Sequence, residues 1–190
     1  MSENVRLDRR VRRTRFAVQE ALIRLMAEKE YEAITVQDIV ERADIVRSTF
    51  YMHYADKEDV LRQGIEYVRR WVEQVAPRGT RFAFSEPLFR HTCDVRPTLR
   101  AVAGHQSWTV MQNVFVRMLG ELIRDDLRRT SERADDTTID TLVHIVSAAW
   151  LSVLTWSLES DRDVGADEMD RLFRTFALPG VDAVLSAPRR

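Results

Sequence analysis

Apolar residues recur at helical spacing along most of this chain of 190 residues, and no alternation of apolar and polar residues runs long enough to build a β-sheet. In the first such segment, about residues 8–28, one face is formed by Val11, Val18, Leu22, Leu25 and Met26. Gly and Pro residues, such as those at 77 and 79, mark the breaks between segments. We therefore predict an all-α fold of about nine helices.

Composition excludes several other classes of protein. Apolar residues make up 45% of the chain, which is enough to bury a core and too many for a disordered chain. Cys93 is the only cysteine, so a disulfide scaffold is excluded, and without a signal peptide we expect a reducing, cytoplasmic location. The net charge is −1, so bulk charge gives no argument for binding nucleic acid.

A stretch without charged residues, residues 141–158, could be mistaken for a membrane span. It is slightly short for that role, contains several Ser and Thr residues and His144, and is flanked by Asp140 and Glu159. A helix that is apolar on nearly all sides is typical of a protein core or an oligomer interface. We expect no membrane contact.

The segment from Thr35 to Tyr54 is the most informative part of the sequence. Thr35 followed by Asp38 predicts a capping box at the start of a short helix that ends near Ala43. After a brief turn, a second short helix begins at Arg47. Two short helices joined by such a turn are typical of a helix-turn-helix, although spacing alone also fits a hairpin that merely packs.

The second helix carries the short polar or flat side chains that reading a major groove requires. These are Arg47, Ser48, Thr49, Tyr51 and His53. Lys57 and Thr35 stand at helix starts, where the helix dipole favours a phosphate. A basic arm for phosphate or minor-groove contacts precedes them, and its arginines are Arg6, Arg9, Arg10, Arg12, Arg13 and Arg15.

The run ITVQDIVERADIVRSTFYMHYADKEDVL resembles the N-terminal domain of the TetR (tetracycline repressor) family of bacterial regulators, over about residues 10–65. The resemblance implies a sequence-specific, DNA-binding transcriptional regulator. The positions that it implies for DNA contact are Thr35, Arg47, Ser48, Thr49, Tyr51, Met52, His53 and Lys57. Phe50 and Tyr54 match its core aromatic positions.

Three residues depart from the family pattern. Asp44 stands where a turn glycine is usual, although Asp tolerates the left-handed conformation. Val46 replaces a capping Ser, which predicts a recognition helix without a side-chain cap. Met52 replaces an outward polar residue and favours an apolar contact, such as a thymine methyl group, over a hydrogen bond.

We place a boundary inside the fourth predicted helix, near residues 66–70. Residues 1–66 are expected to form the DNA-binding domain with its basic arm, and residues 67–190 a helical domain for ligand binding and dimerisation. The second domain contains large apolar side chains with a few polar ones among them. This composition suits either an ordinary core or a small-molecule pocket, and the family resemblance favours the pocket. The candidate lining residues are His91, His105, Trp108, Met111, Gln112, Phe115, His144, Ser147 and Trp150.

Two apolar helices near the end of the chain, about residues 138–158 and 167–177, predict a homodimer through a four-helix bundle. Such a dimer would place its recognition helices on half-sites about 34–36 Å apart, or a multiple of that, on a near-palindromic operator. The expected mechanism is repression, relieved when a small-molecule effector shifts the dimer to a second conformation.

Other functions are less well supported. A regulator controlled by a protein partner, and a ligand-binding protein that has lost DNA binding, stay open as alternatives. His91 and Cys93 cannot easily share a metal ion, because residues two apart do not share a helix face, so with His105 they make a poor metal site. No catalytic set or phosphate loop stands out, and we expect no enzyme activity, no metal and no cofactor.

Overall fold

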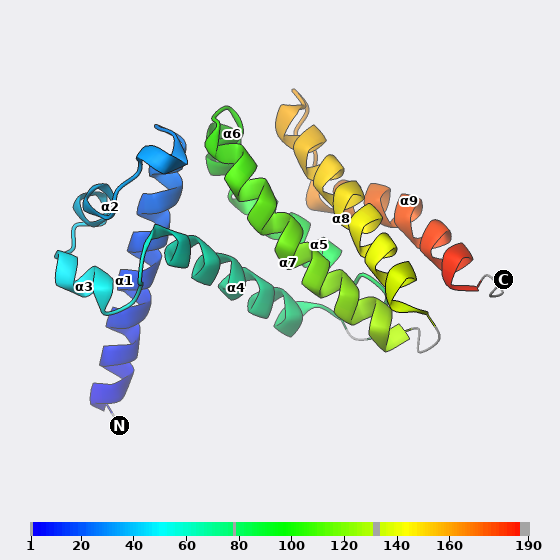
Figure 1. Ribbon diagram of the computed structural model, residues 1–190, viewed down its shortest axis with the longest axis horizontal. Coiled ribbons are helices and arrows are strands. Elements are labelled where there is room, and N and C mark those ends of the chain that lie inside the picture. The colour runs from blue at the N-terminus through cyan, green and yellow to red at the C-terminus, as the bar shows by residue number, and fades with distance from the viewer. Residues whose placement is uncertain (1, 78, 131–133, 187–190) are drawn as a thin grey trace. The chain divides into compact units, whose positions relative to one another are not determined.

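The computed structural model describes residues 2–77, 79–130 and 134–186, with side chains from residue 9 onward (Figure 1). Within these residues the chain forms α-helices and one short 3-10 helix, with no strand, which confirms the all-α prediction. The elements are α1 (Ser2–Met26), η1 (Tyr31–Ala33), α2 (Val36–Arg42), α3 (Arg47–Tyr51), α4 (Lys57–Val75), α5 (Ser85–Asp94), α6 (Arg96–Ala103), α7 (Ser107–Thr130), α8 (Asp136–Glu159) and α9 (Ala166–Ser186).

The chain divides into two compact units, and the division in α4 falls between Tyr67 and Val68. The N-terminal unit contains the residues up to Tyr67 together with Arg100–Val114, and the C-terminal unit contains Val68–Leu99 and the residues from Phe115 onward. Residues 100–114, expected in the second domain, group with the N-terminal unit. Ser107 contributes to this grouping, because its hydroxyl donates to the carbonyl of Lys29 at 3.1 Å.

In the N-terminal unit, α2 packs on α1 and α3 packs on α2 (Figure 1). Val18, Leu22, Leu25 and Met26 of α1 are buried as their spacing predicts, while Val11 is only half-buried. They meet the apolar sides of the later helices, whose buried members include Ile39, Val40, Phe50, Val60 and Leu61. This small core gives the two short helices a rigid support.

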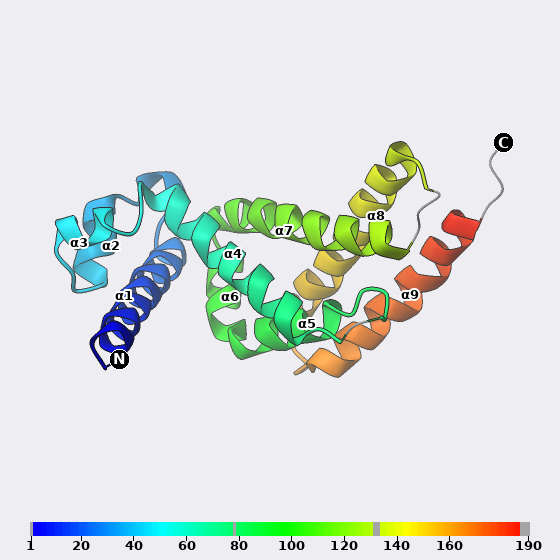
Figure 2. The same ribbon diagram turned by 90° about the horizontal axis from the view of Figure 1, so that it is seen from below.

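In the C-terminal unit, α5, α8 and α9 pack on one another (Figure 2). Aromatic rings fill this core. Trp150 of α8 stacks on Phe89 of α5, with ring centroids 4.4 Å apart and an interplanar angle of 11°, and Phe115 of α7 lies nearly parallel at 6.3 Å. Phe173 of α9 meets Phe89 edge-on at 6.2 Å. Each of the four helices therefore contributes one ring to the same cluster.

Helix α8 is the charge-poor segment of the sequence. By length and composition it could cross a membrane, since its most apolar window has a mean hydropathy of 1.5, and 44% of that window is buried inside the protein. Its buried residues, including Val146, Trp150 and Leu154, face the aromatic core. The buried side of α8 thus forms part of the core of this unit.

Helix α9 is longer than predicted. The pattern ended at Ala177, but the helix continues to Ser186 with Pro179 inside it. A proline inside a helix removes one hydrogen bond and normally ends it. Here Val181 is buried beyond the proline, and Asp182 forms an ion pair with Arg81, so tertiary contacts hold the last turns in place.

Candidate nucleic-acid interface

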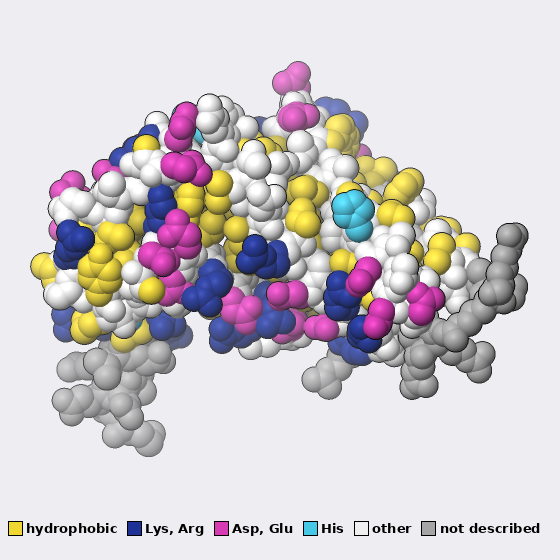
Figure 3. Space-filling model, viewed as in Figure 1, with side chains coloured by type: hydrophobic (Ala, Val, Ile, Leu, Met, Phe, Trp, Pro, Cys, Tyr) yellow, Lys and Arg dark blue, Asp and Glu magenta, His cyan; other side chains and the backbone are white. Residues whose placement is uncertain are grey.

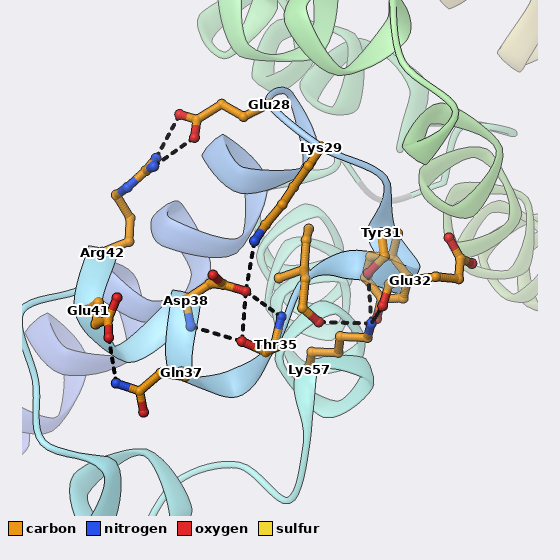
Figure 4. Close-up of polar contacts among 11 residues, drawn as sticks. Glu28, Lys29, Tyr31, Glu32, Thr35, Gln37, Asp38, Glu41, Arg42 and Lys57 are labelled. Atoms are coloured by element: carbon orange, nitrogen blue, oxygen red, sulfur yellow. Dashed lines mark hydrogen bonds and ion pairs between the residues drawn. The ribbon is translucent and has the colours of Figure 1, made fainter.

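The first helix of the motif, α2, begins with the predicted capping box. The Thr35 hydroxyl accepts from the Asp38 backbone N–H at 3.2 Å, and the Asp38 carboxylate accepts from the Thr35 backbone N–H at 2.7 Å (Figure 4). Lys29 adds an ion pair to the same carboxylate at 2.8 Å. The Lys29 ammonium and then the Thr35 hydrogen bonds hold the pKa of Asp38 far below its usual range. Asp38 is therefore ionised at neutral pH, and the start of α2 is fixed.

The other end of α2 is tied to α1. Both terminal guanidinium nitrogens of Arg42 donate to the carboxylate of Glu28, at 2.8 and 2.7 Å (Figure 4). Asp44 then adopts a left-handed conformation with φ of 52°, as expected for the residue in the place of a turn glycine. The backbone N–H of Ile45 bonds to the carbonyl of Val40 at 3.0 Å and closes the turn.

The second helix of the motif, α3, has no side-chain cap at Val46, as predicted. It ends at Tyr51, earlier than the predicted Tyr54, although the helical hydrogen bonds continue as far as the N–H of Tyr54. Phe50 and Tyr54 are buried, with ring centroids 5.7 Å apart, and they hold α3 to the core.

The opposite face of α3 lies in solvent. Arg47 and Ser48 are exposed, as are Tyr51 at 50% and Met52 at 72%. The Arg47 guanidinium donates to the Tyr51 hydroxyl at 3.4 Å and lies 5.7 Å from the centre of the Tyr51 ring. The two side chains thus form a pair on the outward face.

Thr49 and His53 are half-buried at the edge of this face. Burial, and next the nearby Arg15 guanidinium, lower the pKa of His53 below its ordinary value. The imidazole is therefore neutral at pH 7 and presents one donor and one acceptor.

Lys57 points back into its own unit. Its ammonium donates to the carbonyl oxygens of Tyr31 at 2.7 Å, Ile34 at 3.0 Å and Glu32 at 3.3 Å, and it lies 4.5 Å from the centre of the Tyr31 ring (Figure 4). Three acceptors match the three N–H groups of an ammonium. No short motif in the sequence predicts these partners, because they lie 23 to 26 residues away from Lys57.

The basic arm forms the first turns of α1. Its exposed arginines are Arg9, Arg10, Arg12, Arg13 and Arg15, and the side chain of Arg6 lies outside the described residues. Across the face in view, acidic and basic side chains are interspersed, in agreement with the near-zero net charge (Figure 3). The arm, with its five exposed arginines within residues 9–15, is a local concentration of positive charge.

The structure divides the candidate ligand residues between the two units. His105, Trp108, Met111 and Gln112 lie in the N-terminal unit, where Met111 is buried and His105 is exposed. The members in the C-terminal unit are His91, Phe115, His144, Ser147 and Trp150.

Three of the residues in the C-terminal unit, Phe115, Ser147 and Trp150, are buried. His144 is exposed. His91 is half-buried beside Trp71, with ring centroids 5.7 Å apart, and burial lowers its pKa. Phe89 was not among the predicted residues, because its stacking on Trp150 has no signal in the spacing of residues along the sequence.

The described part of the chain places no group of three or more His, Cys, Asp or Glu side chains where they could hold a metal ion. Cys93 instead accepts a hydrogen bond from the buried Arg96 at 3.0 Å.

Comparison with known proteins supports the helix-turn-helix interpretation. Residues 19–63 match the family described as bacterial regulatory proteins, tetR family. The uncharacterized HTH-type transcriptional regulator YxbF of Bacillus subtilis (strain 168) is 49% identical over 61 residues, which are 32% of this chain and 16% of that protein.

Solved structures share the fold over most of the chain. The TetR transcriptional regulator from Streptococcus agalactiae 2603V matches with a TM-score of 0.61 at 22% identity, over 92% of this chain and 99% of that one. The dihydroxyacetone kinase operon activator DhaS matches at 0.59 and 17% identity, over 91% and 98%. Thermus thermophilus FadR in complex with lauroyl-CoA matches at 0.51 and 20% identity, over 93% and 96%. Residues 19–63 therefore match the helix-turn-helix domain of the tetR family of bacterial regulatory proteins, and the fold of the chain is similar to that of a solved TetR transcriptional regulator.

Proposed function

We propose that this protein is a homodimeric, sequence-specific DNA-binding repressor, located in the cytoplasm, that a small molecule releases from a near-palindromic operator. The exposed face of α3 carries the proposal. A buried Phe50 holds this helix to the core, while Arg47, Tyr51 and Met52 are exposed to solvent. A helix presented in this way can enter a major groove.

The residues of this face have distinct roles in the proposal. Arg47 suits a guanine edge, which accepts two hydrogen bonds from a guanidinium, and its contact with Tyr51 orients it before binding. Met52 suits a thymine methyl group. Ser48, Thr49 and the neutral His53 lie beside them and can bond to base edges or phosphates.

Phosphate contacts are assigned to the arginine arm and to Thr35 at the start of α2. Lys57 was expected among them, but its ammonium already bonds to three backbone carbonyls. We assign it instead the role of a positioning residue that joins the start of α4 to the segment before α2.

Exposed stripes on α8 and α9 support the homodimer. Ile145, Ala148, Ser152 and Trp156 lie on one exposed face of α8, at helical spacing. Leu172, Phe176, Gly180 and Ala183 form a similar exposed face of α9. Phe176 is 72% exposed, which is unusual for so large an apolar side chain. A second copy across a two-fold axis would cover both stripes as a four-helix bundle.

The ligand is proposed to bind in the C-terminal unit. Its core of aromatic rings is of the kind that binds small apolar molecules. FadR, which shares the fold, was solved with lauroyl-CoA, so a fold of this type can hold a small molecule.

Selection of random duplex DNA by the purified protein, at one stated salt concentration, tests the proposal. A palindrome is expected, and Arg47→Ala and Tyr51→Ala should each weaken binding to it by about fivefold or more while the dimer stays intact. Arg90→Ala, an exposed arginine of the C-terminal unit, is the matched control. Recovery of unrelated sequences by folded dimers, or unchanged binding in both variants, would overturn the assignment of α3.

A further inference from the structure

Most of the buried polar side chains described in the C-terminal unit have hydrogen-bond partners. The Ser157 hydroxyl donates to the carbonyl of Leu154 at 2.7 Å, and the Thr92 hydroxyl donates to the carbonyl of Phe89 at 2.8 Å. The Ser85 hydroxyl donates to Asp170. Folded proteins normally satisfy buried polar groups in this way, so each exception requires an explanation.

Two exceptions stand together on α8. The Ser147 hydroxyl and the Trp150 indole N–H are buried, at 2% and 0% exposure of their residues, and neither has a hydrogen-bond partner. Residues three apart on a helix share a face, so the two groups lie one turn apart on the same side of α8. Ser147 also differs from Ser157 of the same helix, which turns its hydroxyl back to a backbone carbonyl.

The surroundings determine what could bind there. Phe89 and Phe115 lie nearly parallel to the indole of Trp150, at 4.4 and 6.3 Å between ring centroids, so the ring faces are engaged in aromatic contacts. The N–H at the edge of the Trp150 ring is therefore the polar group of this side chain that has no partner. An indole N–H only donates, so its partner must be an acceptor, and the Ser147 hydroxyl can donate to the same atom.

Among the described residues of this unit, Arg96 is the one buried basic side chain, and its partners bear on the charge that a ligand could carry. Arg96 is paired with Asp163 at 2.6 Å and also donates to Cys93 and to the carbonyl of Val164. It is therefore committed elsewhere, and an anion beside Trp150 would be buried without a countercharge, which is strongly unfavourable.

We propose that Ser147 and Trp150 bind a small, uncharged and largely apolar molecule through one acceptor oxygen, as an aryl ketone provides. The inference rests on the proposed ligand site of the C-terminal unit and specifies its chemistry. It separates Ser147 and Trp150 from the rest of the candidate residues as the pair that binds the polar atom of the ligand.

Three probes of similar size test the proposal: acetophenone, which has a neutral acceptor, ethylbenzene, which has none, and benzoate, which is charged. The protein contains four tryptophans, so labelling with ¹⁵N gives four indole N–H resonances, and Trp150→Phe identifies the one in question. We expect acetophenone to move the Trp150 resonance downfield, ethylbenzene to bind about tenfold more weakly without that shift, and benzoate not to bind.

Ser147→Ala should weaken acetophenone binding by about five- to tenfold. This variant removes a hydroxyl without a partner and breaks no bond of the folded protein, so it should fold even if Trp150→Phe does not. Ser157→Ala, on the same helix, should leave binding unchanged. A Trp150 resonance that acetophenone does not move, or that ethylbenzene moves equally, would overturn the proposal.

The outcome is independent of DNA binding. If acetophenone binds as expected but no palindrome is selected, the regulator proposal fails and the site stands. If a palindrome is selected and the Trp150 resonance does not respond, the regulator stands and this site fails.

Discussion

Lys57 offers the sharpest test of how the DNA-binding unit is built. Lys57→Met removes the ammonium but keeps most of the apolar length of the side chain. The structure predicts that this change destabilises the N-terminal unit, because the ammonium bonds to the carbonyls of Tyr31, Glu32 and Ile34 and packs on the Tyr31 ring. If Lys57 instead contacted DNA directly, the Lys57→Met variant would keep its normal stability and would be attracted less strongly to DNA.

The loss of stability can be estimated from these contacts. A hydrogen bond to a charged group contributes about 1.5–3 kcal/mol, and a cation–π contact about 0.5–1 kcal/mol when exposed. The sum is an upper bound, since Glu32 is exposed and water can hydrate its carbonyl, and the Tyr31 carbonyl also accepts from the N–H of Ile34 at 3.1 Å. We therefore expect a loss of about 2 kcal/mol in the free energy of unfolding, or about 4–8 °C in Tm.

Two measurements separate the possibilities. Urea unfolding should show the loss of stability. Amide hydrogen exchange should place that loss in α2 and in the part of α4 before residue 67, and not in α8. A plot of the logarithm of operator affinity against the logarithm of salt concentration should have the same slope for Lys57→Met as for the original protein. One lost phosphate contact would reduce the slope by about 0.9, the change expected for Arg13→Met in the exposed arm. Unchanged stability together with a slope reduced by that amount would refute the structural role of Lys57.

Three further changes test other parts of the structure. Arg47→Ala should weaken operator binding by about 1–3 kcal/mol in gel-shift titrations, whereas Arg90→Ala should not, and equal losses would exclude a specific contact. Asp38→Ala should lower the free energy of unfolding by about 1 kcal/mol at pH 7 in urea titrations. Contacts in the folded state lower the pKa of Asp38, so the stabilisation that Asp38 provides is complete above about pH 4 and is lost as the pH falls toward the folded pKa. The free energies of unfolding of the variant and the original protein should therefore converge in acid. Phe176→Glu should convert the dimer to a monomer in sedimentation experiments, whereas Phe16→Glu, at a similarly exposed position in the N-terminal unit, should not; a dimer that survives Phe176→Glu would place the interface elsewhere.

Much of the N-terminal unit could be predicted because its signals are local. The capping box joins Thr35 to Asp38 within one turn, and the alternation of a buried Phe50 with an exposed Tyr51 follows from the periodicity of a single helix. The left-handed Asp44 is likewise a property of one turn. Such features depend on residues three or four apart, so reading along the chain finds them.

Contacts between distant residues decided the rest. The role of Lys57 depends on carbonyls that lie 23 to 26 residues away, and backbone carbonyls carry no side-chain signal. The last turns of α9, past Pro179, contact Arg81, which lies 101 residues from its partner Asp182.

The unpaired groups of Ser147 and Trp150 are the third such case. Whether a hydroxyl finds a partner is decided by what packs around it, and here the neighbours are rings from α5 and α7. Helix periodicity could assign Trp150 to the buried side of α8 but could not show that its N–H would meet no acceptor there. The sequence by itself therefore determined the helices, their caps and the outward face of α3, because these are short-range properties of the chain. Only the tertiary structure decided which buried polar groups are satisfied, because that depends on side chains brought together from distant parts of the sequence.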